Sequence, residues 1–179
     1  MLKDNIFITG FMGTGKSTVA CALAQKIKKN LVDTDKIIEN RIGKSIAEVF
    51  DSEGEEYFRR IEKQIFQEIA SRNNLVIATG GGTLLDKENY LLALKNGIVI
   101  LLQASPQVIF SRLQKENSRP LLAGENKLAR IIDLLNKRKA KYSSFEYCID
   151  TCCLTVNQVV EKIIRIYRRE NNENNITEI

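Results

Sequence analysis

The sequence contains no histidine. Without an imidazole side chain, neither a Ser-His-Asp nor a Cys-His triad can form, and a zinc site with histidine ligands is excluded as well. Any catalysis by this chain must therefore depend on carboxylates, lysine, arginine, hydroxyl groups, backbone amides or a bound metal ion.

Long apolar runs and C-x-x-C cysteine pairs are also missing. Apolar runs such as residues 98–102 are far shorter than the ~20 residues of a membrane-spanning helix. Lys3 and Asp4 interrupt the apolar start of the chain, so we expect no secretory signal sequence. No two cysteines are spaced as C-x-x-C, which favours free thiols in a reducing compartment over a zinc site. These absences predict a cytoplasmic protein that has no membrane partner.

The composition predicts one soluble globular domain with an excess of positive charge. Hydrophobic residues make up 44% of the 179 residues, and 27 Lys+Arg outnumber 22 Asp+Glu, a net charge of +5. This excess suits phosphate-bearing ligands or nucleic acid, and it also fits a lysine-rich solvated surface. Residues 171–179 are rich in Asn and Glu without apolar periodicity, so we expect a disordered tail after a single domain of residues 1–170.

Hydrophobic periodicity predicts an alternation of short strands and longer helices. The expected strands are residues 5–9, 31–32, 75–78, 97–102 and 147–149. The expected helices are residues 17–29, 36–41, 53–72, 86–95, 106–114, 128–141 and 156–169. Strands and helices that alternate in this way form parallel sheets covered by helices, so we expect a doubly wound α/β fold.

A glycine-rich loop follows the first expected strand. Residues 10–17 read G-F-M-G-T-G-K-S, which satisfies the phosphate-loop pattern G-x-x-x-x-G-K-[ST] between a strand and a helix. Backbone amides and the helix N-terminus would hold the phosphates, Lys16 would reach the β- and γ-phosphates, and the Ser17 hydroxyl would bind Mg²⁺. A glycine turn that only starts a helix is the alternative. A GTPase is disfavoured because residues 136–139 read N-K-R-K and lack the aspartate of the guanine-reading N-K-x-D pattern.

Two aspartates follow the second expected strand. Asp33 and Asp35 would lie beyond the carboxyl end of the sheet, where ligands of open α/β folds bind, and on one face of an extended segment. One carboxylate could support the metal while the other orients a hydroxyl or accepts its proton. The alternative is that Asp35 serves as the N-cap of the helix over 36–41.

Glycines and arginines supply further candidates for an acceptor site. Residues 80–82 are three consecutive glycines, which indicate close approach of a ligand to the backbone unless they form a plain loop. Arg59 and Arg60 lie on the expected helix over 53–72 and Arg138 lies on a later one, so two guanidinium groups from separate helices could together hold a carboxylate or phosphate. Arg119 lies in a polar segment between two helices and could close over ATP. A solvated surface is the alternative for each arginine.

Taken together, these segments resemble the shikimate kinase family, within the nucleoside-monophosphate-kinase-like group of P-loop proteins. The resemblance spans residues 5–169. Its markers are GFMGTGKST at 10–18, DTD at 33–35, FRRIE at 58–62, GGG at 80–82, RPLL at 119–122, and Lys137-Arg138 followed by Tyr142. It implies a three-layer P-loop kinase fold, with a central five-stranded parallel sheet and helices on both faces. It also implies a substrate-binding region near 36–62 and a lid near 115–124.

The resemblance implies Mg²⁺-dependent transfer of the γ-phosphate of ATP to the 3-hydroxyl of shikimate, on the route to chorismate and the aromatic amino acids. By position, ATP would be held by Gly13, Thr14, Gly15, Lys16, Ser17, Thr18, Arg112 and Arg119. Shikimate would be held by Asp35, Arg59, Gly80, Gly81, Gly82 and Arg138. The metal residues would be Ser17 and Asp33, and the catalytic residues Lys16, Asp33, Asp35 as candidate base, and Arg119. We expect a monomer that does not bind nucleic acid.

One segment departs from the family pattern, and three rival functions stay open. The loop at 151–156 reads TCCLTV where the family often has basic residues and a proline beside adenine. A kinase of gluconate or another small polyol acid is one rival, although FRRIE and GGG argue against it. A nucleoside monophosphate kinase is the second. A nucleic-acid-binding protein is the third, although no RNA-binding motif supports it.

Overall fold

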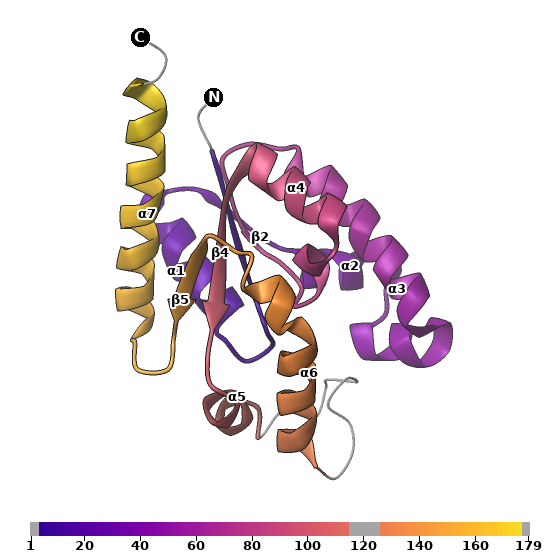
Figure 1. Cartoon of the computed structure of the whole chain (residues 1–179). Helices are drawn as coiled ribbons and strands as arrows, with labels where there is room; N and C mark the ends of the chain where they lie inside the picture. Colours follow the sequence, from indigo (N-terminus) through magenta and orange to yellow (C-terminus); the bar gives the residue numbers. More distant parts are fainter. Residues whose placement is uncertain (1–3, 115–125, 177–179) are drawn as a thin grey trace.

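The computed structural model describes residues 4–114 and 126–176, which form one five-stranded sheet with helices on both faces (Figure 1). All strand pairs are parallel, and the strand order is β2-β3-β1-β4-β5. The strands are β1 (Asn5–Gly10), β2 (Asn30–Asp33), β3 (Leu75–Ala78), β4 (Gly97–Gln103) and β5 (Tyr147–Asp150). The helices are α1 (Lys16–Ile27), α2 (Thr34–Ile42), α3 (Ile46–Ala70), the 3₁₀ helix η1 (Thr83–Leu85), α4 (Lys87–Asn96), α5 (Pro106–Leu113), α6 (Lys127–Tyr142) and α7 (Val156–Ile176).

Alternate residues of the central strand enter two different hydrophobic cores. Ile6 and Ile8 of β1 pack in the core beneath α1 and α7. Phe7 faces the opposite side and packs in the core beneath α3 and α4, where its ring lies 5.8 Å from that of Phe66. Because successive side chains of a strand point to opposite faces, one apolar strand supports both helix layers. The predicted three-layer α/β fold with five parallel strands is confirmed. None of the helices in the described part of the chain is long and apolar enough to span a bilayer.

The strand order places a crevice beside the end of β1. That strand pairs with β3 on one side and β4 on the other, so the segments that follow β1 and β3 leave the sheet at the same edge. The segment that follows β2 leaves at this edge as well, because β2 runs parallel to β3. Ligands of open α/β sheets bind at such a point.

Two helices in the substrate-binding region begin earlier than the periodicity predicts. α2 starts at Thr34, and its N-cap is Asp33, whose Oδ1 accepts a hydrogen bond from the amide of Asp35 at 3.1 Å. The alternative that Asp35 is the N-cap is therefore wrong. α3 starts at Ile46 behind a capping box formed by Ser45 and Glu48.

The apolar periodicity does not predict the early start of α3, because the helix is kinked. Gly54 has φ 84° and ψ 170°, a non-helical conformation that joins two helical halves. A kink of this kind changes the direction of the helix, so the apolar stripe of the second half does not continue into the first.

The last helix also ends later than predicted. α7 continues to Ile176, so residues 171–176 are helical where the sequence predicts disorder. A helix that is already nucleated on the sheet gains one hydrogen bond for each residue it adds, which allows it to continue through Asn and Glu. Tyr147 donates a hydrogen bond to Oε1 of Glu170 at 2.5 Å, which fixes the helix at this point. Residues 177–179 lie outside the described part of the chain.

Candidate active site

The phosphate loop owes its shape to glycines in conformations that other residues rarely adopt. Gly10, Gly13 and Gly15 have φ values of 144°, 78° and 93°. A side chain at Gly10 would be blocked, because a Cβ atom there would lie 2.2 Å from the carbonyl oxygen of Leu102. Gly15 forms the N-cap of α1 without a side-chain hydrogen bond. The first amides of α1 have no partner within the helix, so they form the type of N-terminus that binds phosphate.

Side chains of the loop and of β2 meet beside this helix terminus. Lys16 Nζ donates a hydrogen bond to the carbonyl oxygen of Phe11 at 3.2 Å. The hydroxyl of Ser17 donates to Oδ2 of Asp33 at 2.8 Å, while the other oxygen of Asp33 caps α2. The two predicted metal residues are therefore in direct contact. No group of three or more Asp, Glu or Cys side chains that could hold a metal ion occurs within residues 4–114 and 126–176.

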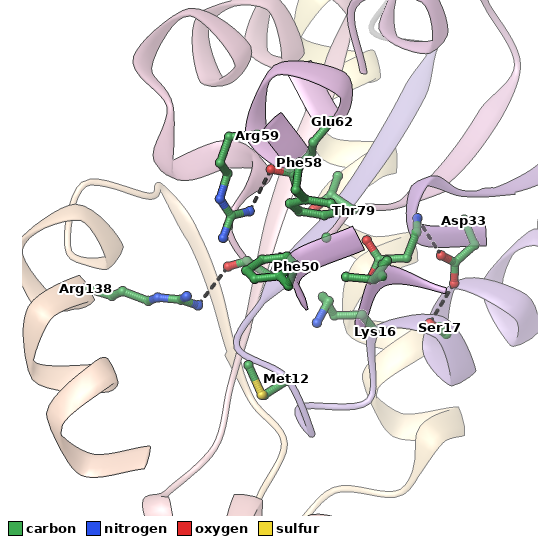
Figure 2. Close-up of a pocket in the computed structure, with 15 residues that line it drawn as sticks. Met12, Lys16, Ser17, Asp33, Phe50, Phe58, Arg59, Glu62, Thr79 and Arg138 are labelled. Atoms are coloured by element: carbon green, nitrogen blue, oxygen red, sulfur yellow. Dashed lines mark hydrogen bonds and ion pairs between the residues drawn. The ribbon is translucent and has the colours of Figure 1, made fainter. Parts of the chain in front are cut away.

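One cavity joins the phosphate loop to the predicted acceptor residues (Figure 2). Arg59 and Arg138 lie toward one side of the close-up, and Lys16, Ser17 and Asp33 lie toward the other. The lining residues are Met12, Lys16, Ser17, Asp33, Asp35, Ile46, Phe50, Phe58, Arg59, Glu62, Thr79, Gly80, Gly81, Gly82 and Arg138. The fold thus collects segments that are more than a hundred residues apart in the chain around one space.

The three glycines after β3 are in contact with different side chains. A Cβ atom at Gly80 would lie 2.6 Å from Oε1 of Glu62 and 2.7 Å from Oδ1 of Asp35. At Gly82 it would lie 2.7 Å from Nη1 of Arg59. A Cβ atom at Gly81 would make only ordinary contacts, the nearest of them 3.4 Å from the carbonyl oxygen of Gly10. Only the absence of side chains at Gly80 and Gly82 allows the two carboxylates and the guanidinium to lie against the backbone.

The two arginines of the cavity are held by different partners. Arg59 donates from Nη1 to Oε2 of Glu62 at 2.7 Å and from Nη2 to Oε1 of Glu55 at 3.0 Å. Burial opposes the charge of Arg59, but attraction and hydrogen bonds from Glu62 and Glu55 outweigh it and raise the pKa of Arg59. Arg138 is buried, donates to the carbonyl oxygen of Gly81 at 2.9 Å, and lies 5.0 Å above the ring of Phe11. Both guanidinium groups are therefore held in fixed positions.

Sequence reasoning assigned no role to several residues of this cavity. Glu62 is only 3% exposed, and it accepts hydrogen bonds from Arg59 and from the hydroxyl of Thr83, the latter at 2.7 Å. The sequence could have indicated this ion pair, because Glu62 follows Arg59 by three residues in the FRRIE segment and residues i and i+3 of a helix share a face. The rings of Phe50 and Phe58 pack against each other across the kink of α3, with centroids 4.9 Å apart and planes tilted by 45°, a contact that only the kinked backbone creates.

Of the predicted arginines, Arg60 is absent from the lining of this cavity. Arg60 points elsewhere, with its guanidinium 5.2 Å above the ring of Tyr57. Arg119 and the predicted lid at 115–124 lie outside the described residues. The choice between Arg59 and Arg60 depends on how α3 is rotated against the sheet, because adjacent residues of a helix point in different directions.

A second pocket lies on the other side of the phosphate loop. It is lined by Thr14, Gly15, Thr18, Val19, Arg112, Thr151, Leu154, Val156 and Val159. Arg112 donates to the carbonyl oxygen of Gly13 at 3.2 Å and to the carbonyl oxygen of Thr151 at 2.9 Å. This side chain therefore ties the phosphate loop to the segment after β5. Leu154 and Val156 give the pocket an apolar wall in the loop that departs from the family pattern.

Comparison with known proteins identifies the family. The sequence profile of shikimate kinase matches residues 12–168. A shikimate kinase of Caldanaerobacter subterraneus subsp. tengcongensis is 45% identical over 91% of this chain and 95% of that protein. A shikimate kinase of Thermodesulfovibrio yellowstonii is also 45% identical, over 94% of this chain and 97% of that protein.

A solved structure agrees with these sequence matches. The shikimate kinase of Acinetobacter baumannii, solved in complex with shikimate, is 33% identical and superposes with a TM-score of 0.89. The superposition covers 93% of this chain and 94% of that one. Motifs, fold and sequence similarity agree along nearly the whole chain, and the protein belongs to the shikimate kinase family.

Proposed function

We propose that this kinase transfers the γ-phosphate of ATP to the 3-hydroxyl of shikimate. The observation that carries the proposal is the single cavity that Lys16 and Ser17 of the phosphate loop share with Asp35, Arg59 and Arg138. Phosphoryl transfer depends mainly on positioning and charge neutralisation, which lysine, arginine and carboxylates provide without histidine.

The acceptor side of the cavity suits a small hydroxylated acid. Arg59 and Arg138 are fixed guanidinium groups that would bind its carboxylate. Asp35, beside Gly80, would accept a hydrogen bond from the reacting hydroxyl and take its proton or orient it. Phe50 and Phe58 would contact the ring. The glycines at 80–82 would allow the substrate to approach the backbone closely.

The nucleotide side suits ATP with Mg²⁺. The amides of residues 13–18 and Lys16 would hold the phosphates. Ser17 and Asp33 present a hydroxyl and a carboxylate oxygen, the hard oxygen ligands that Mg²⁺ prefers. Two protein ligands would be enough, because Mg²⁺ usually takes its other ligands from the phosphates and from water. When bound, Mg²⁺ would neutralise charge on the phosphate oxygens. Arg119 is proposed as the lid arginine and Arg112 as a residue beside adenine.

The remaining expectations from the sequence are also proposals. We infer that the enzyme works as a cytoplasmic monomer whose partners are ATP and shikimate, without nucleic acid or a membrane.

A coupled ADP-release assay tests the proposed function. Shikimate, gluconate, quinate and nucleoside monophosphates are compared as acceptors under identical conditions. We expect kcat/KM for shikimate to exceed that for each other acceptor by about 100-fold or more, since the site is built for one carboxylate and its hydroxyls. Equal or better turnover of gluconate or a nucleotide would contradict the proposal.

A further inference from the structure

Thr34 lies between the two aspartates and is almost completely buried, with an exposed fraction of 1%. Its Oγ1 accepts a hydrogen bond from the backbone amide of Gly80 at 2.9 Å, across 46 residues of sequence. Both atoms are buried, so this hydroxyl supplies the partner that a buried amide requires. The bond joins the first residue of α2 to the first of the three glycines after β3.

Gly80 is also the point where the carboxylates of the acceptor site meet the backbone. Glu62 Oε1 and Asp35 Oδ1 lie 2.6 and 2.7 Å from the position that a Cβ atom of Gly80 would take. Thr83 Oγ1 lies 2.9 Å from the same point. The Gly80 α-carbon therefore packs directly against three oxygen atoms, and a shift of this residue would disturb all of them.

A continuous series of contacts runs from Gly80 to the carboxylate-binding arginine. The amide of Thr83 donates to the carbonyl oxygen of Gly80 at 3.3 Å, and its hydroxyl donates to Glu62 at 2.7 Å. Glu62 in turn accepts from Arg59 at 2.7 Å, and the Arg59 guanidinium lies against Gly82. The position of Gly80 thus affects Asp35 on one side and Arg59 on the other.

We propose that Thr34 is a positioning residue of the acceptor site. Its hydroxyl holds Gly80 at the distance that aligns Asp35 with Glu62, Arg59 and the glycine loop. A threonine suits this task because its branched Cβ restricts the rotamer and thereby fixes the direction of the hydroxyl. The inference rests on the proposed function, because the alignment matters only if Asp35 and Arg59 bind the acceptor.

Two substitutions separate the hydroxyl from the volume of the side chain. Thr34→Val keeps the shape and removes the acceptor of the Gly80 amide, so kcat/KM for shikimate should fall by about tenfold or more. The KM for ATP should change by less than about twofold, because the bond lies on the acceptor side. Thr34→Ser keeps the oxygen and should retain kcat/KM within about threefold of the wild type.

Thr151→Val is the matched control on the nucleotide side. Thr151 is also buried, and its hydroxyl accepts a hydrogen bond from Arg112 at 3.1 Å and donates one to the carbonyl oxygen of Gln103 at 3.0 Å. Loss of this hydroxyl should raise the KM for ATP more than the KM for shikimate. Thr34→Val should therefore impair mainly the use of shikimate, and Thr151→Val should impair mainly the use of ATP.

Amide hydrogen exchange of Gly80 provides a readout that does not depend on turnover. Exchange should be about tenfold faster in Thr34→Val than in the wild type, and near the wild-type rate in Thr34→Ser. A valine variant that matches the wild type in both kcat/KM and Gly80 exchange would overturn the role of Thr34 alone. A Thr34→Ser variant whose kcat/KM for shikimate falls as far as that of Thr34→Val would also overturn this role. Equal increases in the KM for shikimate and the KM for ATP in Thr34→Val would do the same. A wild-type enzyme that does not phosphorylate shikimate would overturn the proposed function, and this role with it.

Discussion

The phosphate loop takes its residues from one stretch of chain, 10–18, whereas the acceptor site collects side chains from α2, α3, the loop after β3 and α6. In the loop, backbone amides and glycine conformations create the binding surface. In the acceptor site, buried side chains hold one another, as Glu62 holds Arg59 and Thr34 holds Gly80. A substitution in the phosphate loop should therefore act through the replaced residue alone. A substitution in the acceptor site should also displace the side chains that the replaced residue holds.

Replacement of the loop lysine should have the largest effect. Lys16→Ala removes the one side-chain cation of the loop while leaving its glycine backbone intact, so kcat should fall by about 10³-fold with little change in unfolding temperature. Steady-state kinetics with ATP and shikimate, together with a thermal melt, measure both. Lys95→Ala, on the exposed side of α4, is the matched control and should behave as the wild type. Activity of Lys16→Ala within tenfold of the wild type would contradict the assignment of the loop.

The acceptor site can be tested through the two carboxylates that bind the same arginine. The Glu62 side chain is 4% exposed and that of Glu55 is 54% exposed. Glu62→Gln should cost about 2 kcal/mol of transition-state binding, about 30-fold in kcat/KM for shikimate, because it weakens a buried charged hydrogen bond. Glu55→Gln should cost less than about 1 kcal/mol, because water screens an exposed pair. Equal effects in the two variants would show that burial does not decide the contribution of these pairs.

The kink of α3 gives a smaller effect that acts through the backbone. Gly54 has φ 84° and ψ 170°, a region that is essentially restricted to glycine, and a Cβ atom there would meet nothing within 4 Å. Gly54→Ala should therefore destabilise the protein by about 1–3 kcal/mol from backbone strain alone. Urea unfolding measures the change.

Gly43 is the matched control for this substitution. It also has space for a Cβ atom, but its φ of 73° and ψ of 14° lie in the ordinary left-handed region. Gly43→Ala should cost only about 1–2 kcal/mol. Because Phe50 precedes the kink and lines the acceptor cavity, Gly54→Ala should also raise the KM for shikimate more than Gly43→Ala does. Identical changes in the two alanine variants would argue against strain at the kink.

The smallest effect concerns acid stability at the N-terminus of α4. Asp86 caps α4, and its hydrogen bond from the Asn89 amide lowers its pKa, with further help from Lys63. A folded pKa below the unfolded value of about 3.9 means that this stabilisation is complete above about pH 5 and disappears as the pH falls through the folded pKa. Asp86→Asn should remove this part of the pH dependence, by less than about 1 kcal/mol because the side chain is largely exposed. Urea unfolding between pH 2.5 and pH 7 should show the two proteins converging in acid; parallel curves would exclude Asp86 as a contributor.

Much of the nucleotide side could be predicted from the sequence because it is local. The strand, the glycine spacing, Lys16 and the start of α1 lie within a few residues of one another, so no distant part of the chain is needed to specify the loop. The parallel sheet was likewise predictable, since apolar strands alternate with amphipathic helices and few topologies satisfy that pattern.

Several features required the tertiary structure because they depend on where distant segments meet. Which of two adjacent arginines enters the cavity depends on how α3 is rotated against the sheet. The helical continuation of α7 to Ile176 likewise had no signal in the local periodicity.

The sequence by itself determined the phosphate-binding chemistry, the fold class and, through its ordered motifs, the family. Only the tertiary structure decided the acceptor site, where Thr34, Glu62, Thr83 and Gly80 touch across long sequence separations. The physical reason is that backbone conformation and helix capping are local properties of a chain. Packing of buried polar groups instead depends on distances that exist only after the segments have come together.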